Sequence, residues 1–471
     1  MKPAQLRPFD ASFLALDGPT TNGHVCLLAV FEGPVSLDAL RERIAARMHL
    51  VPDLRRKLVT MSFGLDRPWW VDDADFDLRR HLSERTLPPG SGDADLAVEV
   101  ADIAATRLER DRPLWETHLL HGLPGGRTAM VTKIHHCVVD GMGSRGLLAA
   151  LFGPDEEVGP AAPGPWHVDP GPSPVKVLTA AARTGGEVVA SALRLERRGV
   201  SMLSSFAGRA VETALALARD GAAPEDASGP ALRPAPETPF NRAVSARRSA
   251  AFTKIPVGAS KALRHTLGVT VNDVVLAITA QGLRRWLLSV GALPEQPLVA
   301  LVPVATGRDE GGMSGNHIAL SLCPLPTDVD DPFDQLRIVH ESMLQAKAAP
   351  SLSESLLKDV FTFSGVSIPS ALAHAATRMH LADRLRLPFN VMVSNVPSTR
   401  SALSLDDRLM EAVYPFPPLS DGLGLMVTVE GCGTDLGLGL LSCPELIPDI
   451  WRLRDLITAA HDHLVGGPIP A

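Results

Sequence analysis

The chain has 471 residues, of which 45% are hydrophobic and 21% charged, so apolar side chains suffice for packed cores and general disorder is excluded. Acidic residues outnumber basic ones, 53 to 45, and the formal net charge of −8 at pH 7 argues against a nucleic-acid partner. Because no run of about 18 uncharged apolar residues occurs, we expect no membrane-spanning helix, and nothing at the start resembles a secretory signal.

Five cysteines are spread widely along the chain and form no CxxC pair: Cys26, Cys137, Cys323, Cys432 and Cys443. Their odd number and wide spacing favour reduced thiols in a cytoplasmic protein over a disulfide framework. The same spacing does not suit a zinc site, so we expect no metal, and most of these side chains should fill the core.

The first part of the chain alternates between strand-like and helix-like stretches. An apolar, β-branched run predicts a strand at His24–Phe31, and Ser36 is a plausible N-cap for a helix with apolar residues at helical spacing. A second helix is expected at 96–108. Strands at 115–120 and 129–135 flank a Pro-Gly-Gly turn and predict a hairpin, which is followed by a short helix at 146–152.

The composition changes after residue 152. Residues 153–174 and 221–239 are crowded with Pro, Gly and Ala and predict linkers, with Ala- and Leu-rich helical residues 176–219 between them. Gly185 and Gly186 should weaken or break that helix, since each glycine costs about 1 kcal/mol relative to alanine. Its scattered arginines favour solvated crossover helices, and the alternative is a basic amphipathic helix lying on an anionic lipid surface.

Regular alternation returns from residue 241. Helices are predicted at 271–288, 332–348 and 449–464, and strands at 297–305, 318–325, 390–396, 425–429 and 436–441. Strand and helix alternation on both sides of the linker predicts two α/β domains. We therefore divide the chain into an N-terminal domain, 1–152, a linker, 153–240, and a C-terminal domain, 241–471.

Two adjacent histidines, His135 and His136, end an apolar strand and are followed by Asp140 and Gly141 at a tight turn. Neighbouring side chains on a strand point to opposite faces, so one histidine should be reactive and the other structural. Histidine suits general-base catalysis because its reference pKa is about 6.5. Two satisfied core histidines beside a turn are the alternative, but the full HHxxxDG spacing favours a catalytic site.

This heptapeptide resembles the HHxxxDG signature of CoA-dependent acyltransferases of the chloramphenicol acetyltransferase type, which peptide condensation domains share. Other segments are similar to a narrower group, the bacterial wax ester synthase/diacylglycerol acyltransferase family. They are the start Phe9–Phe13, the PLWE element at 113–116, the NDVVLA element at 272–277 and the NxxxSNVP element at 390–397. The similarity spans nearly the whole chain, with the motifs in the expected order.

The resemblance implies two chloramphenicol acetyltransferase-like α/β domains that leave a tunnel between them. It implies an acyl-CoA and a hydroxyl acceptor as substrates, direct acyl transfer without an acyl-enzyme, and no cofactor besides acyl-CoA as co-substrate. His136 is then the general base, His135 supports it, Asp140 is structural and pairs with an arginine or the turn backbone, and Gly141 forms the turn. Peripheral association with membranes or lipid inclusions would fit such substrates, and the oligomeric state is open.

Asparagines in the C-terminal half are further candidates. Asn272 could stabilise the oxyanion of the tetrahedral intermediate, because the resemblance places its element opposite the histidines. The alternative is that Asn272 caps a helix beginning near Val274. Asn390, Ser394 and Asn395 are candidate substrate-binding residues that could equally shape the tunnel wall or the domain contact.

Departures from the family pattern concern the acceptor. Met426 stands where the family often has asparagine, Gly431-Cys432 replaces Ser-Tyr, and Gly23 stands where methionine is common. We expect transfer of a long-chain acyl group to diacylglycerol or to a long-chain alcohol. The same chemistry on a hydroxyl or amine of a specialised metabolite is the alternative, and a non-catalytic binding protein of the same fold is the second.

Overall fold

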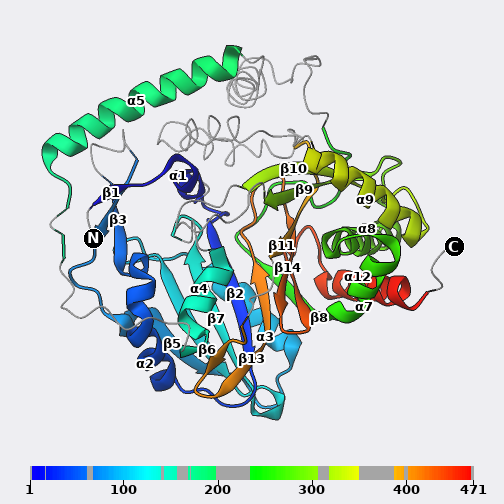
Figure 1. Cartoon of the computed structure of the whole chain (residues 1–471), viewed down its shortest axis with the longest axis horizontal. Coiled ribbons are helices and arrows are strands. Elements are labelled where there is room, and N and C mark those ends of the chain that lie inside the picture. The colour runs from blue at the N-terminus through cyan, green and yellow to red at the C-terminus, as the bar shows by residue number, and fades with distance from the viewer. Residues whose placement is uncertain are drawn as a thin grey trace.

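In a computed structural model, the described residues are 3–15, 17–60, 67–138, 143–155, 168–169, 171–197, 234–305, 318–348, 387–396 and 401–467. Two six-stranded mixed sheets dominate them (Figure 1). The first sheet runs in the order β12 (Ser404–Leu405), β13 (Arg408–Phe416), β2 (His24–Phe31), β7 (Thr128–His135), β6 (Trp115–His121) and β5 (Leu82–Thr86). The second runs β10 (Ile318–Leu325), β9 (Leu298–Ala305), β11 (Val391–Val396), β14 (Leu425–Cys432), β15 (Asp435–Ser442) and β8 (Ser249–Pro256). A mixed α/β chain with two large sheets was expected and is confirmed.

A small third sheet lies beside the first and comprises β1 (Ala4–Gln5), β4 (Trp69–Asp72) and β3 (Arg56–Val59). Helices α2 (Leu37–Arg47) and α4 (Gly143–Phe152) cover one face of the first sheet, where Phe31, Ile44 and Phe152 are fully buried. In the second half, α8 (Val271–Ser289), α9 (Pro332–Ala348) and α12 (Ile450–Gly466) pack together against the second sheet. Helix α7 (Val257–Leu267) packs beside α8.

The two sheets share a core, and two strands from late in the sequence, β12 and β13, belong to the first sheet. Although β12 and β13 follow most of the second sheet in sequence, they extend the first, and β13 pairs antiparallel with β2. Helix α3 (Asp93–Ala105) contacts β2 and β7 of the first sheet and β8 of the second, and one apolar cluster holds residues of all three regions. The domain boundaries at 152 and 240 stay a prediction, and sheet membership does not follow them throughout.

The two sheets come into close backbone contact where β13 packs against β15. A Cβ atom on Gly437 would lie 1.9 Å from the carbonyl oxygen of Val413, and one on Gly439 would lie 2.3 Å from that of Pro415. Only glycine lets the two backbones come so near, so these glycines set the separation of the sheets.

Several local expectations are confirmed. Strand β2 has the predicted bounds, the β6–β7 hairpin forms, and the Ser36 hydroxyl accepts a hydrogen bond from the Ala39 amide as an N-cap. All five cysteines are free and buried.

Other expectations are wrong. Helix α3 begins at Asp93 and ends at Ala105, three residues earlier at each end than predicted. Helix α5 (Pro174–Arg197) continues through Gly185 and Gly186, which were expected to weaken or break it and do not break it. Thr184 accepts a hydrogen bond from Gln5 of β1 at 3.5 Å, and Glu187 pairs with Arg67, just before β4, at 3.2 Å. Such tertiary contacts offset the low helix propensity of glycine. Residues 198–219 of the predicted helical linker lie outside the described residues.

Candidate functional site

The two histidines of the motif lie at the end of β7, and their side chains have different environments. His135 is the last residue of the strand and pairs directly across the ladder with His24 of β2. The amide of His136 donates to the carbonyl of Gly23, 2.8 Å away, just beyond the strand. Because Gly23 immediately precedes β2, the β2–β7 register fixes where both histidines stand.

His135 is buried and hydrogen-bonded at both ring nitrogens. Its Nδ1 accepts from the Cys137 amide at 3.2 Å, so the neutral ring carries its proton on Nε2. That nitrogen lies 3.4 Å from Oδ1 of Asp17, to which it donates. Both ring nitrogens of His135 therefore have protein partners, which hold the ring in one orientation.

Asp17 collects three donors from separate parts of the chain. Its Oδ1 accepts from the Gly23 amide at 2.7 Å as well as from His135, and its Oδ2 accepts from Arg110 at 2.7 Å. Burial alone would raise the pKa of Asp17, but the hydrogen bonds and charges of these partners outweigh it and hold the pKa well below its usual range. Asp17 is thus an anion throughout the physiological range.

His136 has the properties of a neutral base. Its ring stacks on the ring of Phe13, with centroids 3.8 Å apart and planes inclined by 12°. Burial lowers the pKa of His136 to about 4, so the imidazole is uncharged at neutral pH. Its Nδ1 atom is buried and has no hydrogen-bond partner of good geometry among the described residues. A fixed, unprotonated imidazole can accept a proton as soon as a hydroxyl is presented to it.

One group of side chains has the composition of a metal site. Ligand atoms of Asp17, His24 and His135 all lie within 4.8 Å of one another. A metal would need the lone pair of His135 Nε2, yet that atom must carry the proton while Nδ1 accepts from Cys137. The three side chains therefore fit a hydrogen-bonded cluster and do not fit a metal in this arrangement.

The asparagine at the start of α8 is not its cap. The N-cap is Thr270, whose hydroxyl accepts from the Asp273 amide while the Asp273 carboxylate accepts from the Thr270 amide. The expectation that Asn272 caps a helix beginning near Val274 is thus wrong. Asp273 also accepts from Nδ1 of His340 at 2.7 Å, which joins α8 to α9.

The side-chain amide of Asn390, just before β11, forms its hydrogen bonds with other parts of the fold. Asn390 is fully buried, its Oδ1 accepts from the Val299 amide, and its Nδ2 donates to the carbonyl of Pro236 and the side chain of Asn241. These contacts tie residues 236–241 to the second sheet and leave the amide little capacity for a substrate.

Ser394 and Asn395 are neighbours within β11, so their side chains point to opposite faces of the second sheet. Ser394 pairs in register with Thr428 of β14, and Asn395 pairs with Val429. Within the described residues, no hydrogen bond or ring contact joins Asn272, Asn390, Ser394 or Asn395 to either histidine. Their predicted roles in binding stay predictions.

The PLWE element packs beside the histidines. The carbonyl of Leu114 accepts from the His135 amide, and the Trp115 indole stacks on His81 and donates to the Leu54 carbonyl at 2.8 Å. Glu116 pairs with the fully buried Lys133 at 2.7 Å. These contacts give the element a packing role beside the histidines.

Asp140 and Gly141 lie outside the described residues. Sequence reasoning missed Asp17 and Arg110 as neighbours of the motif, since they lie 118 and 25 residues before His135 and carry no local pattern of their own. Phe13 and Gly23 had a signal, the first within the family-like start and the second as a departure from it.

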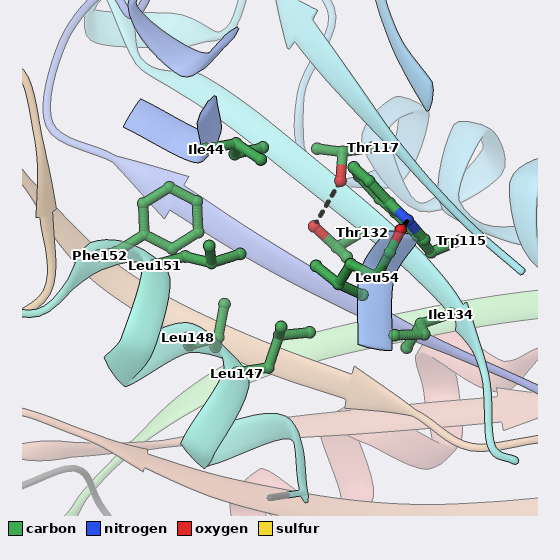
Figure 2. A pocket seen from close by; sticks show the side chains of 10 residues that line it. All are labelled: Ile44, Leu54, Trp115, Thr117, Thr132, Ile134, Leu147, Leu148, Leu151 and Phe152. Atoms are coloured by element: carbon green, nitrogen blue, oxygen red, sulfur yellow. Dashed lines mark hydrogen bonds between the residues drawn. The ribbon is translucent and has the colours of Figure 1, made fainter. Parts of the chain in front are cut away.

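An apolar cavity of about 10 Å³ lies between α4 and the first sheet. Figure 2 shows the side chains that line it. The hydroxyls of Thr117 and Thr132 within it bond to each other at 3.0 Å, so a buried polar pair is satisfied internally (Figure 2). A space of this size admits about one water molecule and cannot hold an acyl chain.

A second, polar cavity of about 150 Å³ is lined by Arg80, Thr106, Arg107, Leu108, Glu109, Arg112, Pro113, Trp115 and Glu116. Acidic neighbours offset part of its positive charge, since Arg112 pairs with Glu109 and Asp111. Neither of these two cavities is lined by His135 or His136, and the tunnel implied by the resemblance stays a prediction.

Comparisons with known proteins cover nearly the whole chain. The family model described as the wax ester synthase/diacylglycerol acyltransferase catalytic domain matches residues 6–275, and the model of the corresponding C-terminal domain matches residues 314–464. Two Mycobacterium tuberculosis proteins, each named provisionally as a diacylglycerol O-acyltransferase, are 33% and 34% identical to the chain. The first alignment covers 96% of this chain and 88% of the relative, and the second covers 95% and 96%.

Solved structures agree on the fold. The wax ester synthase/diacylglycerol acyltransferase from Marinobacter aquaeolei VT8 is 25% identical, with a TM-score of 0.65 over 98% of this chain and all of that chain. The trichothecene 15-O-acetyltransferase TRI3 from Fusarium sporotrichioides is 12% identical and has a TM-score of 0.57 over 98% of this chain and 94% of its own. These matches confirm the chloramphenicol acetyltransferase-like fold class that the sequence predicted.

Proposed function

This chain belongs to the wax ester synthase/diacylglycerol acyltransferase family and is an acyltransferase, and we propose that it transfers a long-chain acyl group from acyl-CoA to a hydroxyl. The acceptor is diacylglycerol, which yields triacylglycerol, or a long-chain alcohol, which yields a wax ester. The observation that carries the proposal is the state of His136: a neutral, stacked imidazole at the end of β7, beside a second histidine whose nitrogens are already occupied.

In the proposed reaction, His136 takes the hydroxyl proton of the acceptor as its oxygen attacks the thioester carbonyl of acyl-CoA. The carbonyl electrons move onto oxygen, and the tetrahedral intermediate collapses with cleavage of the carbon–sulfur bond. The departing CoA thiolate takes the proton back from His136, so atoms and charges balance over one cycle. No covalent acyl-enzyme is needed, because both substrates meet at one base.

The remaining candidates have supporting roles in this proposal. His135 keeps the end of β7 in place, and Asp140 and Gly141 shape the turn that follows. Asn272 would donate a hydrogen bond to the developing oxyanion, and the loss of one such donor typically costs about 3–4 kcal/mol of transition-state stabilisation.

The positions that depart from the family pattern bear on the alternative acceptor. Met426 and Cys432 are buried, and the Cys432 thiol donates to the carbonyl of Met410 at 3.3 Å. These side chains pack within the cores, so they give no support to a specialised metabolite as acceptor. Gly23 is the departure that touches the histidine pair.

Thiol release tests the proposal. The purified chain is incubated with palmitoyl-CoA and either diolein or hexadecanol, and free CoA thiol is measured together with the lipid product. Ester formation with either acceptor supports the proposal. Thiol release only with a small-metabolite hydroxyl or amine would replace the neutral-lipid acceptor with the specialised one, and no turnover with any acceptor would favour a binding protein.

We also propose that helix α5 contacts lipid surfaces, which would bring the chain to its water-insoluble substrates. Val175 and Leu178 are exposed on this helix, at 71% and 73%, and basic Lys176 and Arg183 lie on it as well. Within the described residues, no helix is long and apolar enough to cross a bilayer. Co-sedimentation with anionic vesicles should fall in a Leu178→Glu variant, and unchanged co-sedimentation would contradict this role for α5.

A further inference from the structure

We infer that Asp17, held by Arg110, is a positioning residue for both histidines of the motif. The inference rests on the proposed function, since it names the group that orients the general base. Asp17 precedes β2 and is far from the motif in sequence, and it reaches the two histidines by two different routes.

The first route runs through the ring of His135. Its Nε2 proton points to Oδ1 of Asp17, and the Cys137 amide occupies the opposite nitrogen. A carboxylate at Nε2 favours the tautomer that leaves Nδ1 free to accept from Cys137. Since Cys137 follows His136 directly, the orientation of the His135 ring fixes the backbone on the far side of the base.

The second route runs through the peptide group of Gly23. Its amide donates to Asp17 at 2.7 Å, and its carbonyl accepts from the His136 amide at 2.8 Å. The backbone of the base is therefore held from both sides, by Gly23 before β2 and by the bond from Cys137 to the His135 ring. Loss of the Asp17 carboxylate would loosen both.

Position 23, between the backbone of Phe13 and the ring of His135, has no room for a side chain. A Cβ atom on Gly23 would lie 2.6 Å from the carbonyl oxygen of Phe13 and 2.9 Å from Cε1 and Nε2 of His135. Phe13 is the residue whose ring stacks on His136, so the backbone of Phe13, Gly23 and the His135 ring form one close-packed contact. The glycine at this departure from the family pattern is thus required by the packing around Asp17.

Arg110 and two further bonds hold the Asp17 loop in place. Arg110 donates to Oδ2 of Asp17 at 2.7 Å, and the Asn22 side chain donates to the carbonyl of Ala104 at the end of α3. From the second half of the chain, Arg248 donates to the carbonyl of Thr20 at 2.7 Å. The loop that orients the histidines is therefore anchored to both halves of the molecule.

An Asp17→Asn variant tests the inference, because asparagine keeps the size of the side chain and removes its charge. We expect kcat to fall about 100-fold with little change in KM for acyl-CoA, since misplacement of a catalytic group by about 1 Å has this effect. The exposed Asp38, which pairs with Arg41, gives the matched control Asp38→Asn, which should keep wild-type kcat. A wild-type kcat for Asp17→Asn would overturn the inference.

A second measurement separates positioning from loss of folding. In protein labelled with ¹⁵N-histidine, the His135 signal, assigned with a His135→Gln variant, should show the Nε2-protonated tautomer and should change in Asp17→Asn, while the melting temperature stays within a few degrees.

Arg110→Lys should retain more activity than Arg110→Gln, because lysine preserves the cation beside Asp17. An unchanged tautomer, or equal activity of the two Arg110 variants, would contradict the inference. If the wild type has no activity, the proposed function fails, whereas an active wild type with an active Asp17→Asn variant removes only this inference.

Discussion

The ring of His136 lies nearly parallel to the ring of Phe13, with centroids 3.8 Å apart, and this contact links the first helix, Pro8–Ala15, to the motif at the end of β7. Stacking restricts rotation of the imidazole about its side-chain bonds, so the base does not lose rotamer freedom during the reaction. The aromatic face also excludes water from one side of the ring, which agrees with the lowered pKa of His136.

A Phe13→Leu variant should weaken catalysis without removing it. An aromatic pair contributes about 1 kcal/mol beyond its buried area, so we expect kcat to fall about fivefold. KM for acyl-CoA should be nearly unchanged, because the contact orients the base. Steady-state thiol release measures both constants, and an unaltered kcat would show that stacking does not orient His136.

The pH dependence of the rate should report the lowered pKa of His136. With a pKa of about 4, the base stays unprotonated from pH 8 down to about pH 5, so kcat/KM should be flat there and decline toward pH 4. An unperturbed histidine would give a decline near pH 6.5. A pH–rate profile that falls between pH 7 and 6 would contradict this environment for His136.

The same pKa predicts how stability depends on pH. His136 has its ordinary pKa of about 6.5 in the unfolded chain and a lower one when folded, so the unfolded state binds more protons between pH 6.5 and 4. This residue therefore lowers the free energy of unfolding as the pH falls through that window. Urea unfolding at pH 7 and pH 5 should show a smaller loss in His136→Gln than in the wild type. If the free energy of unfolding falls equally in both proteins, the pH dependence comes from other groups, such as His24, whose burial lowers its pKa to about 3.

A Gly437→Ala variant should separate the two sheets and destabilise the fold. The added methyl group would lie 1.9 Å from a backbone oxygen of β13, which cannot move aside without disturbing its pairing with β2. Overpacking of this kind costs about 1–3 kcal/mol or more. Gly258 in α7 has nothing within 4 Å of its Cβ position, so Gly258→Ala is the control and should leave the melting temperature unchanged or raise it slightly. A stable Gly437→Ala protein would show that the sheets separate at little cost.

Local patterns predicted elements well where a local signal decides them. Ser36 caps its helix because a short hydroxyl side chain suits that position in any fold, and the β6–β7 hairpin follows from its glycine turn. No local signal predicts that β13 joins the first sheet, because its partner strand β2 lies nearly 400 positions earlier in the sequence. The helix at α5 was expected, but it does not break at its two glycines, because tertiary contacts offset their low helix propensity.

The candidate site shows the same limit. The motif pointed to both histidines, but the strand-alternation argument does not apply to them, because β7 ends at His135 and His136 lies just beyond it. The sequence could not assign the partner of His135, because Asp17 and Arg110 come together only when the loop before β2 meets the loop after α3. The alternative that Asn272 caps α8 was wrong by two positions, since Thr270 and Asn272 are both good N-caps by type.

The most direct test of the account is the turnover of a His136→Gln variant, in which a side chain of similar size can no longer act as a base. CoA thiol release from palmitoyl-CoA with diolein or hexadecanol should fall about 100- to 10,000-fold, while the melting temperature stays near that of the wild type. A folded His136→Gln protein that retains a substantial fraction of wild-type turnover would show that another group removes the proton, and the central claim would be wrong.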